Sequence, residues 1–324
     1  MKFAKKIIIG ILIFILVLGI PYFIKINSLK TLMQDDIPAE GAWAPLEMGN
    51  LFYRWYYPDE EASNDEIIVL VHGFSTPHFV WDEMKEFFTN AGYTLLVYDH
   101  FGRGFSERPS VTYDQNLYVE SLKGLLDHLD ISQPINLVGY SMGGPVVGYF
   151  SLKYPHSVKS ISLIAPAGFM KENSIDGLAV MPIAADWFWQ LFGKSLYLNE
   201  VQNESTNIDG RVDFSGSNFV TKFSIQMEYR GFIEALLSTV RNFDLFDAME
   251  MFEDLGRQKI PTIAIWGTDD GVVPFVGSKK LMQSLPHASL EVIDQGKHDI
   301  AYANPSKVAL PIINFLSQET KSQD

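Results

Sequence analysis

Short apolar runs recur along the chain from about residue 50 to residue 293, and most of them end at a glycine or a polar residue. Such runs are typical of strands that are buried on both faces of a sheet. Stretches with helical spacing, such as Val80–Ala91 and Leu117–Leu129, lie between them. The alternation predicts an α/β fold with a mostly parallel sheet and helices on both faces. The predicted strands are Leu51–Tyr57, Glu66–Val71, Thr94–Tyr98, Ile135–Val138, Ser160–Ile164, Thr262–Trp266 and Leu290–Ile293.

One long stretch breaks this alternation. From about Phe169 to Leu245 no strand-like apolar run appears, aromatic residues crowd positions 187–192, and Phe232–Val240 has helical spacing. An insertion between two core strands is typical of a helical cap that shapes an apolar pocket, and the alternative is simply more core. We therefore divide the globular part into a first core segment, a cap and a second core segment, over residues 31–168, 169–245 and 246–324.

The first 30 residues form a separate unit. Ile7–Ile24 contains no charged residue, and as a helix its 18 residues would span roughly 27 Å, close to the hydrocarbon thickness of a bilayer. Three lysines precede this run and two follow it, which favours a cytoplasmic N-terminus. We predict a membrane anchor over residues 1–30, transmembrane over about 7–24, with an extracytoplasmic catalytic domain. A cleaved signal peptide is the alternative, although no small-x-small cleavage site follows the run.

Charge and cysteine usage narrow the function classes. The 324 residues carry a formal net charge of −14, and the first 30 residues are basic, so the rest of the chain is more acidic still. A nucleic-acid partner is not expected, because binding phosphates needs a basic face. The chain has no cysteine, which excludes disulfides, thiolate catalysis, iron–sulfur clusters and cysteine zinc sites.

The strongest chemical motif is Gly139-Tyr140-Ser141-Met142-Gly143, directly after the predicted strand Ile135–Val138. The pattern G-x-S-x-G between a strand and a helix is a nucleophile elbow, in which the serine occupies a strained turn and its hydroxyl projects above the sheet. The glycines keep other side chains out of the crowded turn. We predict Ser141 as a nucleophile.

A serine hydroxyl needs a base that takes its proton. When a serine of this type of elbow is the nucleophile, the acid and then the base follow it along the chain. His298 follows the last predicted strand and lies in a loop, which is where the base is expected. His156 comes too soon after Ser141, and His287 lies before the last strand, at the opposite edge from the site. His298 is therefore the predicted base.

The base in turn needs an acid that orients it, and the acid is expected in the loop after Thr262–Trp266. Asp269 and Asp270 both stand there, and from position alone either could reach the base. Asp244 and Asp247, which precede the strand, are weaker candidates.

An oxyanion hole needs two backbone N–H donors that are in place before negative charge develops. We predict that Met142, the residue after the nucleophile, supplies one donor, and that Phe74, in the loop after an early strand, supplies the other. His72 stands directly before a glycine turn, so we predict that it braces this loop by a hydrogen bond and does not act as a catalytic base.

Four motifs, in the same order, resemble those of the α/β-hydrolase family over about residues 50–318. The resemblance is to its lipases, esterases and ring-cleavage-product hydrolases with a helical cap. It implies a catalytic triad in which the spacing of the acid loop selects Asp270 over Asp269. The motifs are His72-Gly73-Phe74, the D-x-x-G-x-G-x-S turn from Asp99 to Ser106, the elbow Gly139–Gly144, and Gly267-x-x-Asp270-x-x-x-Pro274 together with His298.

The same resemblance narrows the chemistry. Family dehalogenases and epoxide hydrolases use an aspartate nucleophile, whereas position 141 is serine. Ring-cleavage-product hydrolases commonly have Asn before the serine, and Tyr140 is more similar to lipases and esterases. Cofactor-free haloperoxidases share the triad. The resemblance implies a serine esterase that acts on medium-chain or lipid-derived acyl esters through an acyl-enzyme, without metal or cofactor.

Two alternatives stay open. One is carbon–carbon bond hydrolysis of a dienone acid, whose carboxylate would call for an arginine in the pocket. The other is a catalytically inactive binding protein on the same fold, which the intact serine, histidine and elbow glycines disfavour. The candidate arginines are Arg103, Arg211, Arg230 and Arg241.

Overall fold

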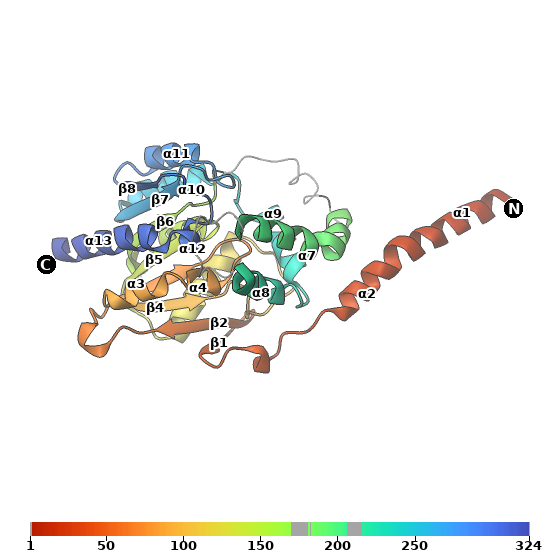
Figure 1. The fold of residues 1–324 in the computed structure, drawn as a ribbon, viewed down its shortest axis with the longest axis horizontal. Helices are drawn as coiled ribbons and strands as arrows, with labels where there is room; N and C mark the ends of the chain where they lie inside the picture. The colour runs from red at the N-terminus through yellow and green to blue at the C-terminus, as the bar shows by residue number, and fades with distance from the viewer. Residues whose placement is uncertain (1, 170–180, 182, 206–215, 324) are drawn as a thin grey trace.

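The computed structural model describes residues 2–169, 181, 183–205 and 216–323, and it contains one eight-stranded sheet (Figure 1). The strand order is β1-β2-β4-β3-β5-β6-β7-β8. The first two pairings, β1 with β2 and β2 with β4, are antiparallel, and the other five are parallel. The predicted α/β fold with a mostly parallel sheet is therefore confirmed. The strands are β1 (Gly41–Leu46), β2 (Gly49–Tyr56), β3 (Ile67–Val71), β4 (Thr94–Tyr98), β5 (Ile135–Tyr140), β6 (Val158–Ile164), β7 (Thr262–Gly267) and β8 (Ser289–Ile293).

Helices cover both faces of the sheet. One hydrophobic cluster joins one face of the sheet to α4, α5, α10 and α11, and a second joins the other face to α3, α12 and α13. Because both faces are covered, the central strands are buried at nearly every position, which explains their continuous apolar runs. The helices are α3 (Lys85–Asn90), α4 (Gln115–His128), α5 (Gly143–Lys153), α10 (Met249–Gln258), α11 (Val276–Ser284), α12 (Ile300–Ala303) and α13 (Pro305–Gln323).

The predicted helix over residues 80–91 was wrong in its first half. A 3₁₀ turn, His78–Trp81, comes first, and the α-helix begins only at Lys85. Phe79, Val80 and Trp81 are all buried. Short 3₁₀ turns are frequent before the N-termini of α-helices, and the hydrophobic spacing of the sequence does not distinguish such a turn from the first turn of the helix.

In the described part of the segment between β6 and β7, three further helices precede α10: α7 (Ala184–Ser205), α8 (Gly216–Gln226) and α9 (Phe232–Asn242). They share a hydrophobic cluster that includes Phe223 and Phe232 and that also takes in Phe79 from the core. We call the described part of α7–α9 the cap helices. Residues 170–180, 182 and 206–215 lie outside the described part of the chain, and Arg211 is among them.

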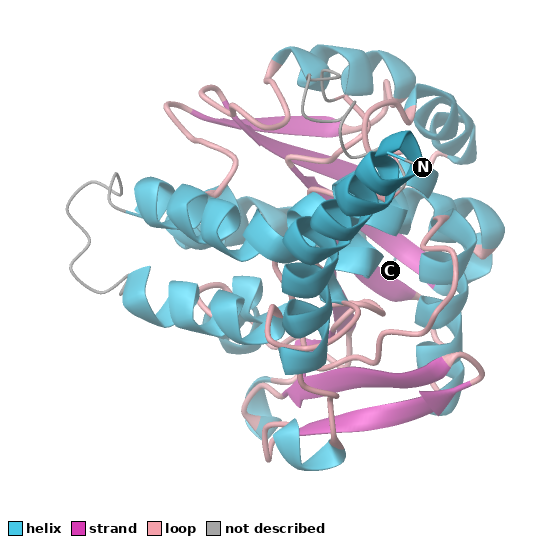
Figure 2. Ribbon diagram, turned by 90° about the vertical axis from the view of Figure 1, so that its right-hand side faces the viewer, coloured by secondary structure: helices cyan, strands magenta, loops and turns pink. Residues whose placement is uncertain are grey.

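The N-terminal segment is one long helical element that projects away from the globular part (Figures 1 and 2). It runs through α1 (Lys2–Phe14), a π-helical turn (Ile15–Gly19) and α2 (Ile20–Ser28). Pro21 stands at the start of α2, where its missing N–H explains why the regular ladder is interrupted just before it. Phe3–Ser28 is long and apolar enough to cross a membrane, and its most apolar stretch is not buried by the rest of the protein. An anchor and a signal sequence both have this character.

Candidate active site

Ser141 lies on the tight turn between β5 and α5. Its φ of +53° is in the left-handed region, which costs energy for a residue with a side chain. Steric crowding explains why the two flanking positions, 139 and 143, are glycines. A Cβ atom at Gly139 would lie 2.4 Å from the carbonyl oxygen of Gly143, and one at Gly143 would lie 2.1 Å from that of Val71. Only glycine fits at either position, so the strained elbow exists because the sequence leaves space for it.

His298 links the serine to an acid. Its Nε2 lies 3.0 Å from Ser141 Oγ, and its Nδ1 lies 2.9 Å from Oδ2 of Asp270. Because a carboxylate only accepts, Nδ1 carries the proton and Nε2 is left to accept from the serine hydroxyl. The other Asp270 oxygen accepts from the N–H groups of Val272 and Val273 at 2.9 and 2.7 Å. These bonds fix the carboxylate, so the imidazole is held in the tautomer that a general base requires.

The other candidates for the acid have hydrogen-bond partners other than His298. Asp269 is exposed, and its carboxylate accepts from Thr268. Asp244 is bonded to the side chains of Gln115 and Tyr149. Asp247 caps the backbone N–H of Met249.

The two other histidines that were considered as the base, His287 and His156, are not part of this arrangement. His287 Nε2 lies 2.9 Å from the carbonyl oxygen of Ile260, and His156 sits in the 3₁₀ turn Pro155–Ser157. Among the residues the structure describes, no group of three or more His, Cys, Asp or Glu side chains is arranged to hold a metal ion.

The loop after β3 lies directly beside the nucleophile. Val71 pairs with Gly139 at the ends of β3 and β5, and a Cβ atom at Gly73 would come within 3.2 Å of Ser141 Cβ. Within the described part of the chain, neither Phe74 N–H nor Met142 N–H donates a hydrogen bond. Two backbone donors beside one serine fit the predicted oxyanion hole.

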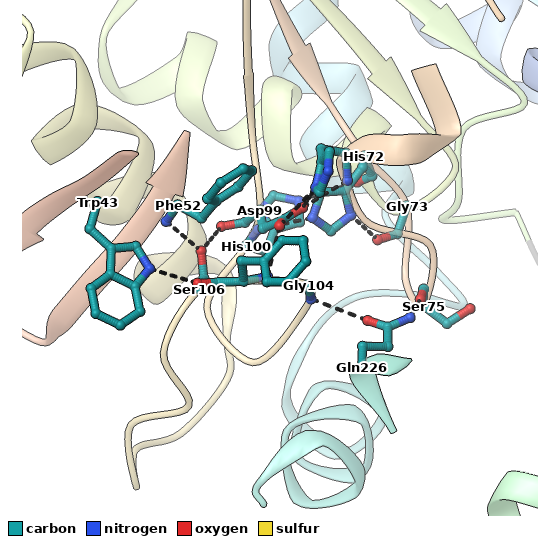
Figure 3. Close-up of polar contacts among 12 residues, drawn as sticks. Trp43, Phe52, His72, Gly73, Ser75, Asp99, His100, Gly104, Ser106 and Gln226 are labelled. Carbon is teal, nitrogen blue, oxygen red and sulfur yellow. Dashed lines mark hydrogen bonds and ion pairs between the residues drawn. The ribbon is translucent and has the colours of Figure 1, made fainter. Parts of the chain in front are cut away.

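Two buried histidines, His72 and His100, support this loop by hydrogen bonds (Figure 3). His72 Nδ1–H donates to Gly73 O at 2.8 Å, and His72 Nε2 accepts from the backbone N–H of His100 at 2.9 Å. Burial holds the pKa of His72 well below its ordinary value and lowers the pKa of His100 to about 3. Both rings are therefore neutral at pH 7, which this hydrogen-bond pattern requires. The prediction that His72 braces the loop is confirmed.

Arg103 holds the same loop through the carbonyl oxygen of Phe74, the residue after Gly73. Its side chain is fully buried, and Nε donates to Phe74 O at 2.9 Å. The rest of the guanidinium donates to Tyr118 Oη at 2.9 Å and to Thr239 Oγ1 of α9 at 2.8 Å. The guanidinium is thus engaged within the protein, so Arg103 is not placed to bind a substrate carboxylate.

The other arginines considered for that role also have partners. Arg241 pairs with Asp186 at 3.2 Å, and Arg230 donates to Ile26 O at 3.3 Å. The described residues thus give the dienone-acid alternative no support from its candidate arginines.

Gln226, at the end of α8, was not singled out from the sequence. Its Nε2 donates to Ser75 O at 2.8 Å, and its Oε1 accepts from Gly104 N–H at 3.2 Å (Figure 3). Ser75 follows Phe74, so a cap helix is tied to the segment that carries the predicted oxyanion donor. No motif announces such a residue, because its partners lie more than 100 positions away in the chain.

His298 is also supported by a residue from another part of the chain. Tyr140, the variable residue of the elbow, donates from its hydroxyl to His298 O at 2.9 Å, and the two rings lie 5.3 Å apart. The residue before Ser141 therefore also positions the loop that carries His298, the predicted base.

A cavity of about 290 Å³ lies between α8 and the core, lined in part by His78, Phe105 and Ile225. Neither Ser141 nor His298 lines it, so this cavity does not measure the space available to an acyl chain at the nucleophile.

Comparison with known proteins agrees with the geometry. Residues 66–305 match the family model described as the alpha/beta hydrolase fold, which is well over half of the chain. The chain belongs to the α/β-hydrolase family.

Members of this family with several activities are similar to the chain. A putative non-heme chloroperoxidase of Synechocystis is 27% identical over 266 residues, covering 81% of this chain and 94% of that protein. Mouse monoacylglycerol lipase ABHD6 is 24% identical over 269 residues, covering 77% of this chain and 75% of the lipase. The crystal structure of an enol-lactonase from Burkholderia xenovorans covers 85% of this chain and all of its own, with 19% identity and a TM-score of 0.72. The last likeness shows the fold alone.

Proposed function

We propose that this α/β hydrolase cleaves carboxylic esters through an acyl-enzyme on Ser141, with medium-chain or lipid-derived acyl groups as its substrates. The observation that carries the proposal is the relay from Ser141 Oγ to His298 Nε2 at 3.0 Å and from His298 Nδ1 to Asp270 at 2.9 Å. It begins on a strained serine beside two backbone N–H groups, those of Phe74 and Met142, which have no hydrogen-bond partner among the described residues.

The reaction follows from this geometry. His298 Nε2 takes the hydroxyl proton as Ser141 Oγ attacks the acyl carbonyl carbon, and the N–H groups of Phe74 and Met142 donate to the oxygen that becomes negative. Asp270 stabilises the imidazolium cation. His298 then gives the proton to the departing alkoxide, which leaves as an alcohol and the acyl-enzyme remains.

The second half uses the same groups. His298 takes a proton from water, the resulting nucleophile attacks the acyl carbon, and the protonated imidazole returns its proton to Ser141 as the carboxylic acid leaves. The helix α5 begins at Gly143, so its N-terminal dipole adds to the stabilisation of the oxyanion.

Three features favour a lipid-derived ester. The named lipase is a relative over most of the chain, Tyr140 precedes the nucleophile as in lipases and esterases, and the N-terminal helix is long enough to cross a bilayer. We propose that this helix stays attached as a single-pass anchor and that the lysine bias around it places the catalytic domain outside the cytoplasm.

The test is hydrolysis of p-nitrophenyl esters from acetate to palmitate by the full chain in detergent, with Ser141→Ala beside it. We expect turnover that peaks at medium or long chains and is lost in the variant. Activity confined to acetate would refute the lipid-derived substrate. The absence of turnover on every ester, in a folded protein, would refute ester hydrolysis.

A further inference from the structure

The N-terminal segment contacts the cap region at two places, one from the helix to α7 and one from Lys30, just after the helix, to the loop between α8 and α9. Trp187 Nε1 of α7 donates to Leu18 O, inside the apolar run, at 2.7 Å. Below the helix, Lys30 N–H donates to Glu228 O at 2.9 Å, and Arg230 N–H donates to Lys30 O at 2.8 Å. Two separate points of attachment fix a direction, so the helix leaves the globular part from the side of the cap helices (Figures 1 and 2).

The outward side of α7 is apolar next to this contact. Phe188, Phe192 and Leu196 follow one another at intervals of four, so they share one face of the helix. Phe192 and Leu196 are 46% and 44% exposed, and the rings of Phe188 and Phe192 lie 5.3 Å apart. Just before the helix, Met181 and Ile183 are 54% and 82% exposed. We call these five side chains the outer apolar patch. Several exposed large apolar side chains gathered at one helix are typical of a surface that contacts a protein partner or a membrane.

With the apolar run spanning a bilayer as proposed above, Trp187, whose ring lies 6.0 Å from that of Phe192, stands at the depth of the membrane interface. Leu18, which accepts the Trp187 bond, precedes the first charged residue after the apolar run, Lys25, by seven positions, or about 10 Å of helix. Interfacial helices bury their apolar face about 5–10 Å below the headgroup boundary, and tryptophan favours that level. Asp186, in the first turn of α7, is paired with Arg241 at 3.2 Å, which lowers the cost of placing it there.

We propose that the outer apolar patch is seated in the lipid bilayer beside the N-terminal helix, so that α7 lies in the interface and an acyl substrate enters the enzyme from the membrane. The inference rests on the membrane span proposed above. It is independent of which bond the enzyme cleaves.

The chain has no cysteine, so one introduced thiol can be labelled without background. We would place an environment-sensitive fluorophore at Phe192→Cys and, as the matched control, at Val292→Cys. Val292 is also apolar and is 48% exposed, but it lies in β8, at the end of the molecule away from the N-terminal helix (Figure 1). Both full-length proteins are reconstituted in phosphatidylethanolamine–phosphatidylglycerol vesicles.

We expect the label at 192 to be quenched by nitroxide lipids and protected from aqueous iodide, and the label at 292 to show the reverse. Equal iodide quenching at the two positions overturns the proposal. Because the readout needs no turnover, a lipid-buried label in a protein without esterase activity would refute ester hydrolysis and leave the patch in the bilayer.

A functional arm uses Phe192→Ser combined with Leu196→Ser. We expect hydrolysis of a vesicle-borne ester to fall about tenfold, because two apolar anchors are lost, while a water-soluble butyrate ester is turned over as by the wild type. Thermal unfolding of the variant checks that it folds. If the vesicle-borne ester is hydrolysed at the wild-type rate, entry through the patch is refuted.

Discussion

Gln226 provides a direct test of how the loop after β3, which carries the predicted oxyanion donor Phe74, is held in place. The side chain is 2% exposed, and both ends of its amide are bonded to core backbone, Ser75 O and Gly104 N–H. Gln226→Met keeps the length of the side chain and removes both bonds. An unpaired buried polar group costs about 1–3 kcal/mol, so the two together should lower the free energy of unfolding by about 2–6 kcal/mol. The Phe74 N–H would also lose part of its support, and we expect kcat to fall about tenfold.

Gln190→Met is the matched control for this experiment. Gln190 is 3% exposed on α7, and within the described residues its amide nitrogen has no hydrogen-bond partner. Removing such a group should change stability by less than about 0.5 kcal/mol or increase it. Urea unfolding of the full chain in detergent, followed by tryptophan fluorescence, measures both variants beside kcat for a p-nitrophenyl ester. Equal losses in the two variants would refute the role assigned to the Gln226 bonds.

Three further predictions concern the triad, the elbow and pH. Asp270→Asn should lower kcat about 10³–10⁴-fold, whereas Asp269→Asn should change it less than about twofold, and ester kinetics would refute this assignment if the order were reversed. Gly143→Ala places a Cβ 2.1 Å from Val71 O, so we expect little folded protein, and a wild-type melting temperature would contradict the geometry. Burial lowers the pKa of His100 from 6.5 to about 3, so the unfolded chain binds the extra proton below pH 6.5. Stability should then fall by about 1.4 kcal/mol per unit as pH drops from 6 toward 3, and urea titrations in which His100→Gln shows the same slope would argue against this.

The triad side chains could be located from sequence because each stands next to a strong local signal. Ser141 follows a buried strand inside a glycine pattern, and His298 follows the last strand of a regular alternation. In a parallel sheet the carboxyl ends of the strands lie at one edge, so residues after different strands meet there. The choice between Asp269 and Asp270 needed the family spacing, because neighbouring loop residues differ only in where their side chains point.

The supporting residues could not be found in this way. Gln226 acts through bonds to backbone groups 151 and 122 positions away, and a glutamine near the end of a helix carries no motif. The first strand, Gly41–Leu46, was also missed. It is an edge strand that contains Pro45 and is only partly buried, so it lacks the apolar run that marks central strands. The contact between Trp187 and Leu18 joins two apolar helices whose sequences are equally compatible with many packings.

The proposed mechanism requires Ser141 to be an activated nucleophile. The most direct measurement is reaction of the full-length protein with a fluorophosphonate probe, followed by mass spectrometry of its peptides, for the wild type, Ser141→Ala and His298→Ala. We expect a single adduct on Ser141 in the wild type, none in Ser141→Ala and strongly slowed labelling in His298→Ala. A folded wild-type protein without an adduct at Ser141, or one that is labelled at a different residue, would contradict it.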